Sequence, residues 1–403
     1  MLSLCILSNA WTGSVARAQN ADELLLLGGQ RFDTPQKAFV ANDAIRIRDG
    51  RIISFEKTAV EPNSESGRVV VVQLADDDYV LPGIIDCHAH YNVRLIKRRR
   101  EEFEIMPVIY LANGVTTTFS CGEFDPVKMR ELRLAIESGE QLGPHLINSG
   151  PYFGRARPGW QTGKTAVEIK KEVDFWVEQG VGGFKAKAIA PEDLQPLVEQ
   201  AHQHGLSVTG HLGSGYRNSV NPRDAISLGI DRIEHFVGGD AMPATKSAYR
   251  SLPNITREQA EYLKAVELFI DTETVFDATL TAYGYFGSPR EEYEYWIDES
   301  KFFTPYMQEV AKARGPTDAG EQFERIYEAK LSTIGTFFKM GGKISLGTDH
   351  VSDGYHLPGF GAHRELDAFV RAGIPPADAL VIGTLNGAQA LGLENSRGSI
   401  EIG

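Results

Sequence analysis

The chain has 403 residues, enough for one large α/β barrel with an appendage or for roughly two to three smaller domains. Hydrophobic residues make up 42% and charged residues 24%, as expected of a globular protein with a large core. The net charge of −13 argues against nucleic acid or an anionic membrane as a partner. No apolar run approaches the roughly 20 residues that span a bilayer, and three cysteines are too few for a disulfide framework.

Residues 1–18 have features of a secretory signal peptide. They are mildly apolar and end in Ala16-Arg17-Ala18, an A-x-A cleavage pattern. No Lys or Arg precedes the apolar part, however, and polar residues interrupt it. We predict a signal peptide and a secreted or periplasmic location, with a disordered tail and a cytoplasmic location as the alternative.

Residues 19–80 are predicted to form a small β-sandwich module. Strand-like patterns occur in "LLLLGGQRFD", "AIRIRDGRIISFEK" and "RVVVVQL". Within the second of these, Asp49-Gly50 is a hairpin-turn signal. The module therefore precedes the main body of the fold.

Residues 81–395 are predicted to form a (β/α)8 TIM barrel, which makes the fold class α/β. Eight β-rich runs recur here: "GIIDCHAH", "VTTTFS", "HLINSG", "GGFKAKA", "LSVTGH", "IDRIEH", "LFIDTET" and "KISLGTDH". Helical patterns such as "PEDLQPLVEQAHQHG" separate most of them, and this alternation is typical of right-handed βαβ units around a parallel sheet. Eight units fit a barrel better than an open doubly wound sheet, and no G-x-G-x-x-G or Walker loop supports the dinucleotide alternative.

Polar residues stand at or near the ends of five of these predicted strands. They are His88 and His90 on the first strand, Lys185 on the fourth, His211 on the fifth, His235 on the sixth and Asp349 on the eighth. In a TIM barrel the carboxyl ends of the strands meet at one rim, so these side chains are expected to converge. Neutral imidazoles and a carboxylate are suitable ligands for Zn²⁺ or a similar divalent ion.

Lys185 is the unexpected member of this set, because an ammonium beside two dications would be repelled. Addition of CO₂ to its amine would give a carbamate whose two oxygens can each bind one metal. We therefore predict two divalent ions, most simply Zn²⁺, bridged by a carbamate on Lys185. A water bridging the two ions would be hydroxide-like at neutral pH, with Asp349 as both a ligand and the proton shuttle.

The whole set of motifs resembles the binuclear-metal branch of the amidohydrolase superfamily, especially its imidazolonepropionase-like and dipeptidase-like members. The phrases "PGIIDCHAH", "NGVTTT", "RIEH" and "GTD" stand in that family's usual order, and "HRELDAFVRAGIPPADALVIGTLNGAQALGL" is similar to its C-terminal region. The resemblance implies a hydrolase of amide or ester bonds. It also implies that His88 and His90 bind the more buried ion, that His211 and His235 bind the more exposed one, and that Lys185 bridges them.

Three features qualify the resemblance. Lys187 shares a strand face with Lys185 and is a rival for the bridge, although Lys185 in "GVGGFK" aligns with the family's G-A-D-x-I-K pattern. A Gly-Gly-His-Gly element common in related dipeptidases is replaced by "SGPYFGRARPGWQTGK". Residues 396–403 are expected to begin a strand that returns to the β-sandwich, whose C-terminal part would then be truncated.

Substrate-binding candidates come from the loops near the predicted rim. His145, expected at the end of the third strand, and Tyr216 are placed to polarise a carbonyl. Tyr152, Arg155 and Arg157 lie in the following loop, where an arginine could bind a substrate carboxylate. For each of these the alternative is a solvated loop residue. His202 and His204 are predicted to be surface residues of a helix. The long segment between the seventh and eighth strands forms either a lid or additional helices.

The sequence therefore predicts a metal-dependent hydrolase that cleaves a peptide-like, N-acyl amino acid or cyclic amide bond. Two alternatives remain: a mononuclear deaminase of the same superfamily, in which the bridging lysine would be superfluous, and a non-catalytic barrel that acts as a binding module. The expected partner is a small-molecule substrate rather than nucleic acid or a membrane. Monomer and homo-oligomer both remain open.

Overall fold

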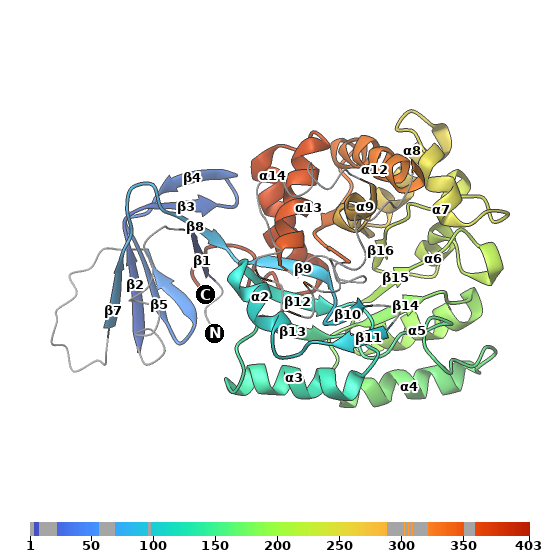
Figure 1. The fold of residues 1–403 in the computed structure, drawn as a ribbon, viewed down its shortest axis with the longest axis horizontal. Helices are drawn as coiled ribbons and strands as arrows, with labels where there is room; N and C mark the ends of the chain where they lie inside the picture. The colour runs from blue at the N-terminus through green and yellow to red at the C-terminus, as the bar shows by residue number, and fades with distance from the viewer. Residues whose placement is uncertain are drawn as a thin grey trace.

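The computed structural model describes residues 4–7, 22–55, 69–95, 98–287, 302, 305, 308, 321–349 and 359–403. A β-rich module lies to one side of a larger α/β body (Figure 1), and the C-terminus of the chain lies beside the module. Among the described residues, no helix combines the length and the apolar character needed to cross a membrane.

The module contains two four-stranded sheets. One has the order β6 (Arg51–Ser54), β5 (Ala44–Arg48), β2 (Glu23–Leu27), β7 (Val69–Gln73), and the other β1 (Leu4–Leu7), β8 (Tyr79–Pro82), β3 (Gln30–Asp33), β4 (Ala38–Ala41). Asp49 and Gly50 both have positive φ, 50° and 75°, between the antiparallel strands β5 and β6. This is the left-handed geometry that a two-residue I′ hairpin turn requires, so the predicted hairpin is confirmed.

The larger body has a TIM-barrel-like arrangement of parallel strands. Its strands are β9 (Ile84–Ala89), β12 (Val115–Ser120), β13 (His145–Asn148), β14 (Phe184–Lys187), β15 (Val208–His211), β16 (Arg232–Glu234), β17 (Val275–Asp277) and β18 (Ile344–Ser345). They form two sheets with the orders β13-β12-β9 and β14-β15-β16-β17-β18. Backbone hydrogen bonds also connect the two sheets at both of their edges. Cys87 N donates to Leu346 O at 2.8 Å, and Gly182 N donates to Asn148 O at 2.9 Å.

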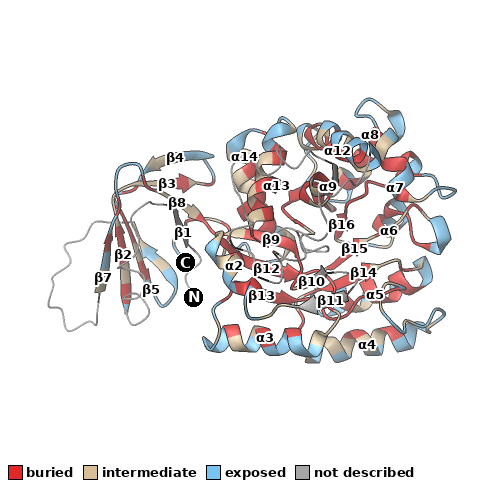
Figure 2. Ribbon diagram, in the orientation of Figure 1, coloured by how far each residue is buried: buried red, intermediate tan, exposed pale blue. Residues whose placement is uncertain are grey.

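Helices cover the outside of these strands. They are α2 (Met106–Ala112), α3 (Pro126–Ser138), α4 (Ala166–Glu178), α5 (Pro191–Gln203), α6 (Pro222–Ser227), α7 (Ala248–Ser251), α8 (Ala260–Asp271), α9 (Leu280–Gly287), α12 (Glu321–Lys339), α13 (Phe360–Arg371), α14 (Pro376–Val381) and α15 (Gly387–Ala390). Figure 2 shows the strands mostly buried, with exposed residues on the outer faces of helices such as α3 and α4. A small hairpin of β10 (Asn92–Leu95) and β11 (Arg98–Glu101) follows the first barrel strand.

The sequence of α4 explains both its start and its orientation. Thr165 and Glu168 form a capping box, which satisfies two backbone N–H groups at the first turn. Ile169 and Val173, four residues apart, are fully buried against the strands. The helix therefore packs one apolar face on the barrel, as the predicted βαβ rhythm requires.

Two expectations about local structure need correction. The seventh strand was placed on Leu268–Thr274, but Leu268 lies in α8 and the strand is Val275–Asp277. The apolar run there belongs to the buried face of the helix. Residues 396–403 form no strand, although Ile400 packs in the core of the β module and Gly403 N donates to Ile52 O at 2.9 Å. Most of the predicted signal peptide lies outside the described residues.

Candidate metal centre

The structure brings the six predicted ligands together at the carboxyl ends of the barrel strands. His88 lies on β9, His90 directly follows it, Lys185 lies on β14, His211 ends β15, His235 follows β16, and Asp349 follows β18. The ring centroids of neighbouring histidines lie 4.4–5.3 Å apart, in the order His90, His88, His235 and His211. The strand-end placement inferred from the sequence is thus what the structure shows.

His88, His90 and Asp349 form the tightest group. Asp349 Oδ1 lies 3.3 Å from His88 Nε2 and 2.9 Å from His90 Nε2. Ligands of a tetrahedral ion with bonds of about 2.1 Å stand about 3.4 Å apart, so these three atoms fit one metal ion. They belong to the first and last strands of the barrel, so an ion here would join the two.

The Nε2 atom of His235 faces the same space as these three ligand atoms. Its Nδ1 lies 2.6 Å from Thr279 Oγ1, and that hydroxyl donates to Ala278 O at 2.7 Å. Thr279 therefore accepts from Nδ1–H, which leaves the lone pair on Nε2. Nε2 is buried and has no hydrogen-bond partner. Buried imidazole nitrogens without partners are what a metal ion would satisfy.

Glu234 belongs to this centre and was missed in the sequence. Its side chain is fully buried, and Oε2 lies 3.5 Å from His88 Nδ1, 3.8 Å from His235 Nε2 and in contact with Lys185 Nζ. Cys121 Sγ donates to Oε1 at 2.9 Å. Strand alternation placed Glu234 and His235 on opposite faces, but His235 adopts a left-handed φ of 61°, which brings both side chains into the centre.

Left-handed backbone recurs around the rim at residues other than glycine. Besides His235, the residues are Ala188 after β14, Thr279 after β17 and Asp349 after β18, with φ between 45° and 53°. Such conformations are sparsely populated and cluster at functional sites, where the surrounding structure holds them in place. Here they turn the ends of the strands so that consecutive residues can face the same centre.

A second layer of hydrogen bonds fixes this rim from below. Asp86 is fully buried and accepts from His88 N at 3.0 Å, from Thr348 N at 3.1 Å and from Thr348 Oγ1 at 2.7 Å. On the opposite side, Lys330 Nζ donates to His235 O at 2.6 Å. These contacts hold the backbone at three of the strand ends that carry candidate ligands.

Electrostatics favour neutral imidazoles and an ionised aspartate. Burial lowers the pKa of His88 to about 4, and burial together with the ammoniums of Lys187 and Lys185 lowers the pKa of His211 well below its ordinary value. Burial would raise the pKa of Asp349, but the adjacent histidines, including His88 and His90 through their hydrogen bonds, hold that pKa well below its usual range. Neutral imidazoles and carboxylates are the forms that bind metal ions.

Lys185 and Lys187 occupy different surroundings. Lys185 is buried, pairs with Glu234, and lies with Nζ 3.1 Å from Cys121 Sγ. Lys187 Nζ lies 5.5 Å from the ring centroid of Tyr152, and burial lowers its pKa. The two lysines share a strand, but Lys185 is the one that contacts the buried Glu234 carboxylate and the Cys121 thiol.

The predicted substrate residues divide into two groups. Tyr152 is almost fully buried and packs on Phe124, with a ring-centroid distance of 5.0 Å, whereas Tyr216 is 40% exposed and lies in the loop after β15. Arg155 is exposed and donates to the backbone of that same loop, at Arg217 O.

Two further groups of predicted residues lie away from the centre. Arg157 and Lys164 both pair with Glu172 of α4, so Arg157 is held by the helix. His202 and His204 are exposed and pair with surface aspartates, which confirms their predicted surface position.

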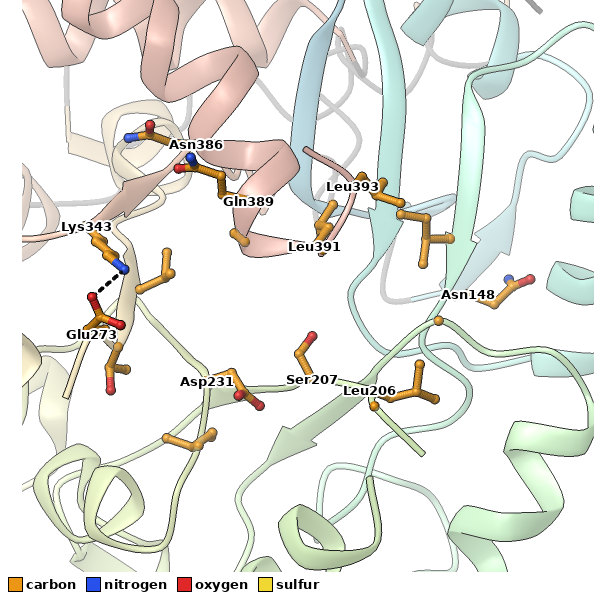
Figure 3. Close-up of a pocket in the computed structure, with 18 of the residues that line it drawn as sticks. Asn148, Leu206, Ser207, Asp231, Glu273, Lys343, Asn386, Gln389, Leu391 and Leu393 are labelled. Atoms are coloured by element: carbon orange, nitrogen blue, oxygen red, sulfur yellow. Dashed lines mark hydrogen bonds and ion pairs between the residues drawn. The ribbon is translucent and has the colours of Figure 1, made fainter. Parts of the chain in front are cut away.

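His145 requires a correction. It was expected at the end of the third strand, but it is the first residue of β13, so it lies at the opposite end of the barrel from the six candidate ligands. There it lines a cavity of about 1270 Å³ together with Ser207, Asp231 and Lys343, each of which directly precedes a strand (Figure 3). A role for His145 in polarising a substrate carbonyl at the rim is therefore not supported.

The fold and the centre define a class: TIM-barrel-like proteins with a buried histidine and carboxylate cluster at the carboxyl ends of the strands. Residues 79–239 match the model of the Amidohydrolase family. A crystal structure of a Xaa-Pro dipeptidase with bound methionine is similar, with a TM-score of 0.68 and 22% identity over 94% of this chain and 91% of that one. At this identity the likeness concerns the fold.

Two curated relatives are similar over about half of the chain. An enamidase of Eubacterium barkeri is 27% identical over 209 residues, and an N-acetylglucosamine-6-phosphate deacetylase of Bacillus subtilis (strain 168) is 27% identical over 216 residues. Each match covers 49% of this chain and 52% of the relative, so the chain matches about half the length of these proteins. The likeness to the Amidohydrolase family therefore rests on residues 79–239, and the likeness to the dipeptidase structure extends to the fold of nearly the whole chain.

Proposed function

We propose that the protein is a binuclear-metal hydrolase that cleaves an amide bond in a small molecule. Its similarity to an enamidase and to a deacetylase supports chemistry at a C–N bond. The substrate classes that we favour are dipeptides, N-acyl amino acids and cyclic amides. The edge-to-edge backbone hydrogen bonds between the two sheets support a closed (β/α)8 barrel as the scaffold.

One observation carries the proposal: buried imidazole nitrogens and an ionised carboxylate, from strands distant in the sequence, face one another. His88, His90 and Asp349 would hold one ion, and His211 and His235 a second. The unpartnered Nε2 of His235 fits this role. Buried polar atoms are otherwise almost always hydrogen-bonded, so an orphaned nitrogen in this cluster indicates a ligand.

Divalent ions in this centre would supply a nucleophilic water at neutral pH and would polarise the substrate carbonyl. Asp349 is placed to move the proton. Its side chain is 23% accessible and its carboxylate is ionised, so it can accept a proton from the attacking water and deliver it to the leaving nitrogen. In the overall reaction a C–O bond forms, the C–N bond breaks, and the amine leaves with the transferred proton.

Lys185 would complete the centre as a carbamate. Its ammonium loses one proton to water, Nζ forms a bond to the carbon of CO₂, one C=O electron pair moves onto oxygen, and a second proton leaves Nζ. The product, –NH–COO⁻, offers two oxygen ligands at the position where Lys185 now lies beside Glu234 and His88. Lys187 is the rival position for this group on the same strand.

Metal analysis of purified protein, prepared with bicarbonate, tests the proposal together with Lys185→Ala and Lys187→Ala. We expect about two divalent ions per chain and hydrolysis of at least one member of a dipeptide and N-acyl amino acid library. Lys185→Ala should lose the weaker-bound ion and the activity, whereas Lys187→Ala should retain both ions. One ion per chain, with Lys185→Ala indistinguishable from wild type, would instead support the mononuclear deaminase. An absence of bound metal and of hydrolysis would support a binding module.

A further inference from the structure

The unexplained feature of the centre is Glu234, a carboxylate that is fully buried beneath the candidate ligands. Burying a charge costs free energy unless partners compensate for it, so the chain must hold this group for a reason. Its two oxygens have different surroundings. Oε1 accepts from Thr209 Oγ1 at 2.8 Å and from Cys121 Sγ at 2.9 Å, while Oε2 faces Lys185 Nζ.

A chain of buried groups fixes the direction of this carboxylate. Arg232 Nε donates to Thr209 Oγ1 at 3.2 Å, and Thr209 donates in turn to Glu234. Arg232 is itself anchored, because its guanidinium donates to Cys87 O at 3.1 Å and lies over the ring of Phe119. Because Thr209 is held in this way, Oε1 stays on the Thr209 side and Oε2 faces Lys185.

We infer that Glu234 is a positioning residue for the bridging group on Lys185, an inference that rests on the proposed function. A lysine carbamate keeps one N–H, and Glu234 Oε2 is the acceptor beside that nitrogen. This hydrogen bond would hold the carbamate nitrogen and leave the two carbamate oxygens available as ligands. It also selects Lys185 over Lys187, whose Nζ lies instead near the Tyr152 ring.

Glutamine at position 234 would break this arrangement with little change of shape. Its amide has one oxygen and one NH₂, so it cannot accept from Thr209 and Cys121 and also accept from Lys185. In one orientation of the amide its NH₂ group faces the N–H of Lys185, and in the other it faces the donors Thr209 and Cys121. Removal of an outer partner of a metal ligand typically weakens metal affinity 10- to 100-fold.

The test uses the full chain reconstituted with Zn²⁺ and ¹³C-bicarbonate. The readouts are the ¹³C carbamate resonance, the Zn²⁺ content, and the Kd of the weaker-bound ion measured by chelator competition. For Glu234→Gln we expect this Kd to rise about 10- to 100-fold and the carbamate resonance to decrease in parallel. Glu123→Gln is the matched control, because Glu123 is also a buried glutamate but is held by Ser120 and Asn148. It should leave all three readouts unchanged.

A double-mutant cycle separates positioning from direct ligation. Glu234, His88 and His235 also satisfy the spacing of a metal site by themselves. If Glu234 acts through Lys185, adding Glu234→Gln to Lys185→Ala should cause no further loss of Zn²⁺. A further loss would make Glu234 a ligand and overturn the inference, and so would a carbamate resonance and Kd that stay within about twofold of wild type in Glu234→Gln.

Circular dichroism would show whether Glu234→Gln folds. If it does not, Thr209→Val carries the same test, because it removes a donor that holds Oε1. The Kd should then rise at least threefold, and an unchanged Kd would count against the inference. A wild-type protein without the carbamate resonance would instead refute the bridge in the proposed function, so the two failures are distinguishable.

Discussion

Replacing Thr279 by valine tests whether a single hydrogen bond prepares His235 for metal binding. Thr279 is fully buried, and its Oγ1 lies 2.6 Å from His235 Nδ1. Valine has almost the same shape and the same branched Cβ, so the hydroxyl is the only group lost. In the wild-type protein this hydroxyl sets the tautomer, because it donates to Ala278 O and must therefore accept from the imidazole.

The magnitude follows from two effects. Loss of the partner that orients a ligating histidine typically weakens metal affinity 10- to 100-fold, which corresponds to about 1.4–2.7 kcal/mol. In addition, the Nδ1–H of His235 becomes a buried donor without an acceptor, which lowers the unfolding free energy of the metal-free protein by about 1–3 kcal/mol. Thr279→Val should therefore lose both metal affinity and stability.

Chelator competition for Zn²⁺ and chemical denaturation measure these two quantities. Thr279→Ser keeps the hydroxyl and should bind Zn²⁺ within about threefold of wild type. Thr384→Val is the control for a lost buried hydroxyl, since Thr384 donates only to the helix carbonyl Leu380 O at 2.7 Å. If Thr279→Val bound Zn²⁺ as tightly as Thr384→Val, the argument from the His235 tautomer would be refuted.

Three further predictions concern other parts of the molecule. Asp349→Asn should reduce kcat by about 10²–10⁴-fold in a steady-state assay of the best library substrate, and a smaller effect would remove Asp349 as the proton shuttle. Burial raises the pKa of Glu123 to about 7, so the folded state binds this proton more tightly than the unfolded state between pH 4.5 and 7, and stability falls as pH rises through that window. Between pH 5 and pH 8 the unfolding free energy of the wild type should fall by about 1–3 kcal/mol more than that of Glu123→Gln, as measured by chemical denaturation. An equal change in the two proteins would contradict the burial argument. Gly154→Ala should cost about 2–3 kcal/mol by thermal unfolding, because its φ is 122° and a Cβ would stand 2.2 Å from Lys187 O; Gly159→Ala, also at positive φ but with open space around it, should cost less.

The barrel-like body and the six candidate ligands could be predicted because their signals are local and repeated. Each ligand stands at or near the end of a β-rich run, and the placement of strand ends at one rim follows from the βαβ rhythm alone. The prediction for His145 was wrong because this residue begins its β-rich run instead of ending it. The first and last residues of this short strand are only three positions apart, but they lie toward opposite ends of the barrel.

Glu234 could not be predicted by the same reasoning, because alternation along a strand excludes two consecutive residues from one face. The left-handed φ of His235 removes that exclusion, and a histidine at this position does not by itself indicate a left-handed backbone. A usable signal does exist in "DRIEH". Arg232 and Glu234 share a face of a strand that must be buried on both sides, so two opposite charges in its interior imply a polar network there.

The carboxylate of Asp86 has a consequence for how the protein reaches its native state. It joins β9 to Thr348, a residue 262 positions further along the chain. Contacts of such long sequence separation carry a large loop-closure entropy and form slowly. The first and last barrel strands therefore meet only when nearly the whole body is in place, and a chain interrupted before Thr348 would present His88 and His90 without the aspartate that completes their ligand set. If the proposed ion binds here, its binding would therefore report complete assembly of the barrel.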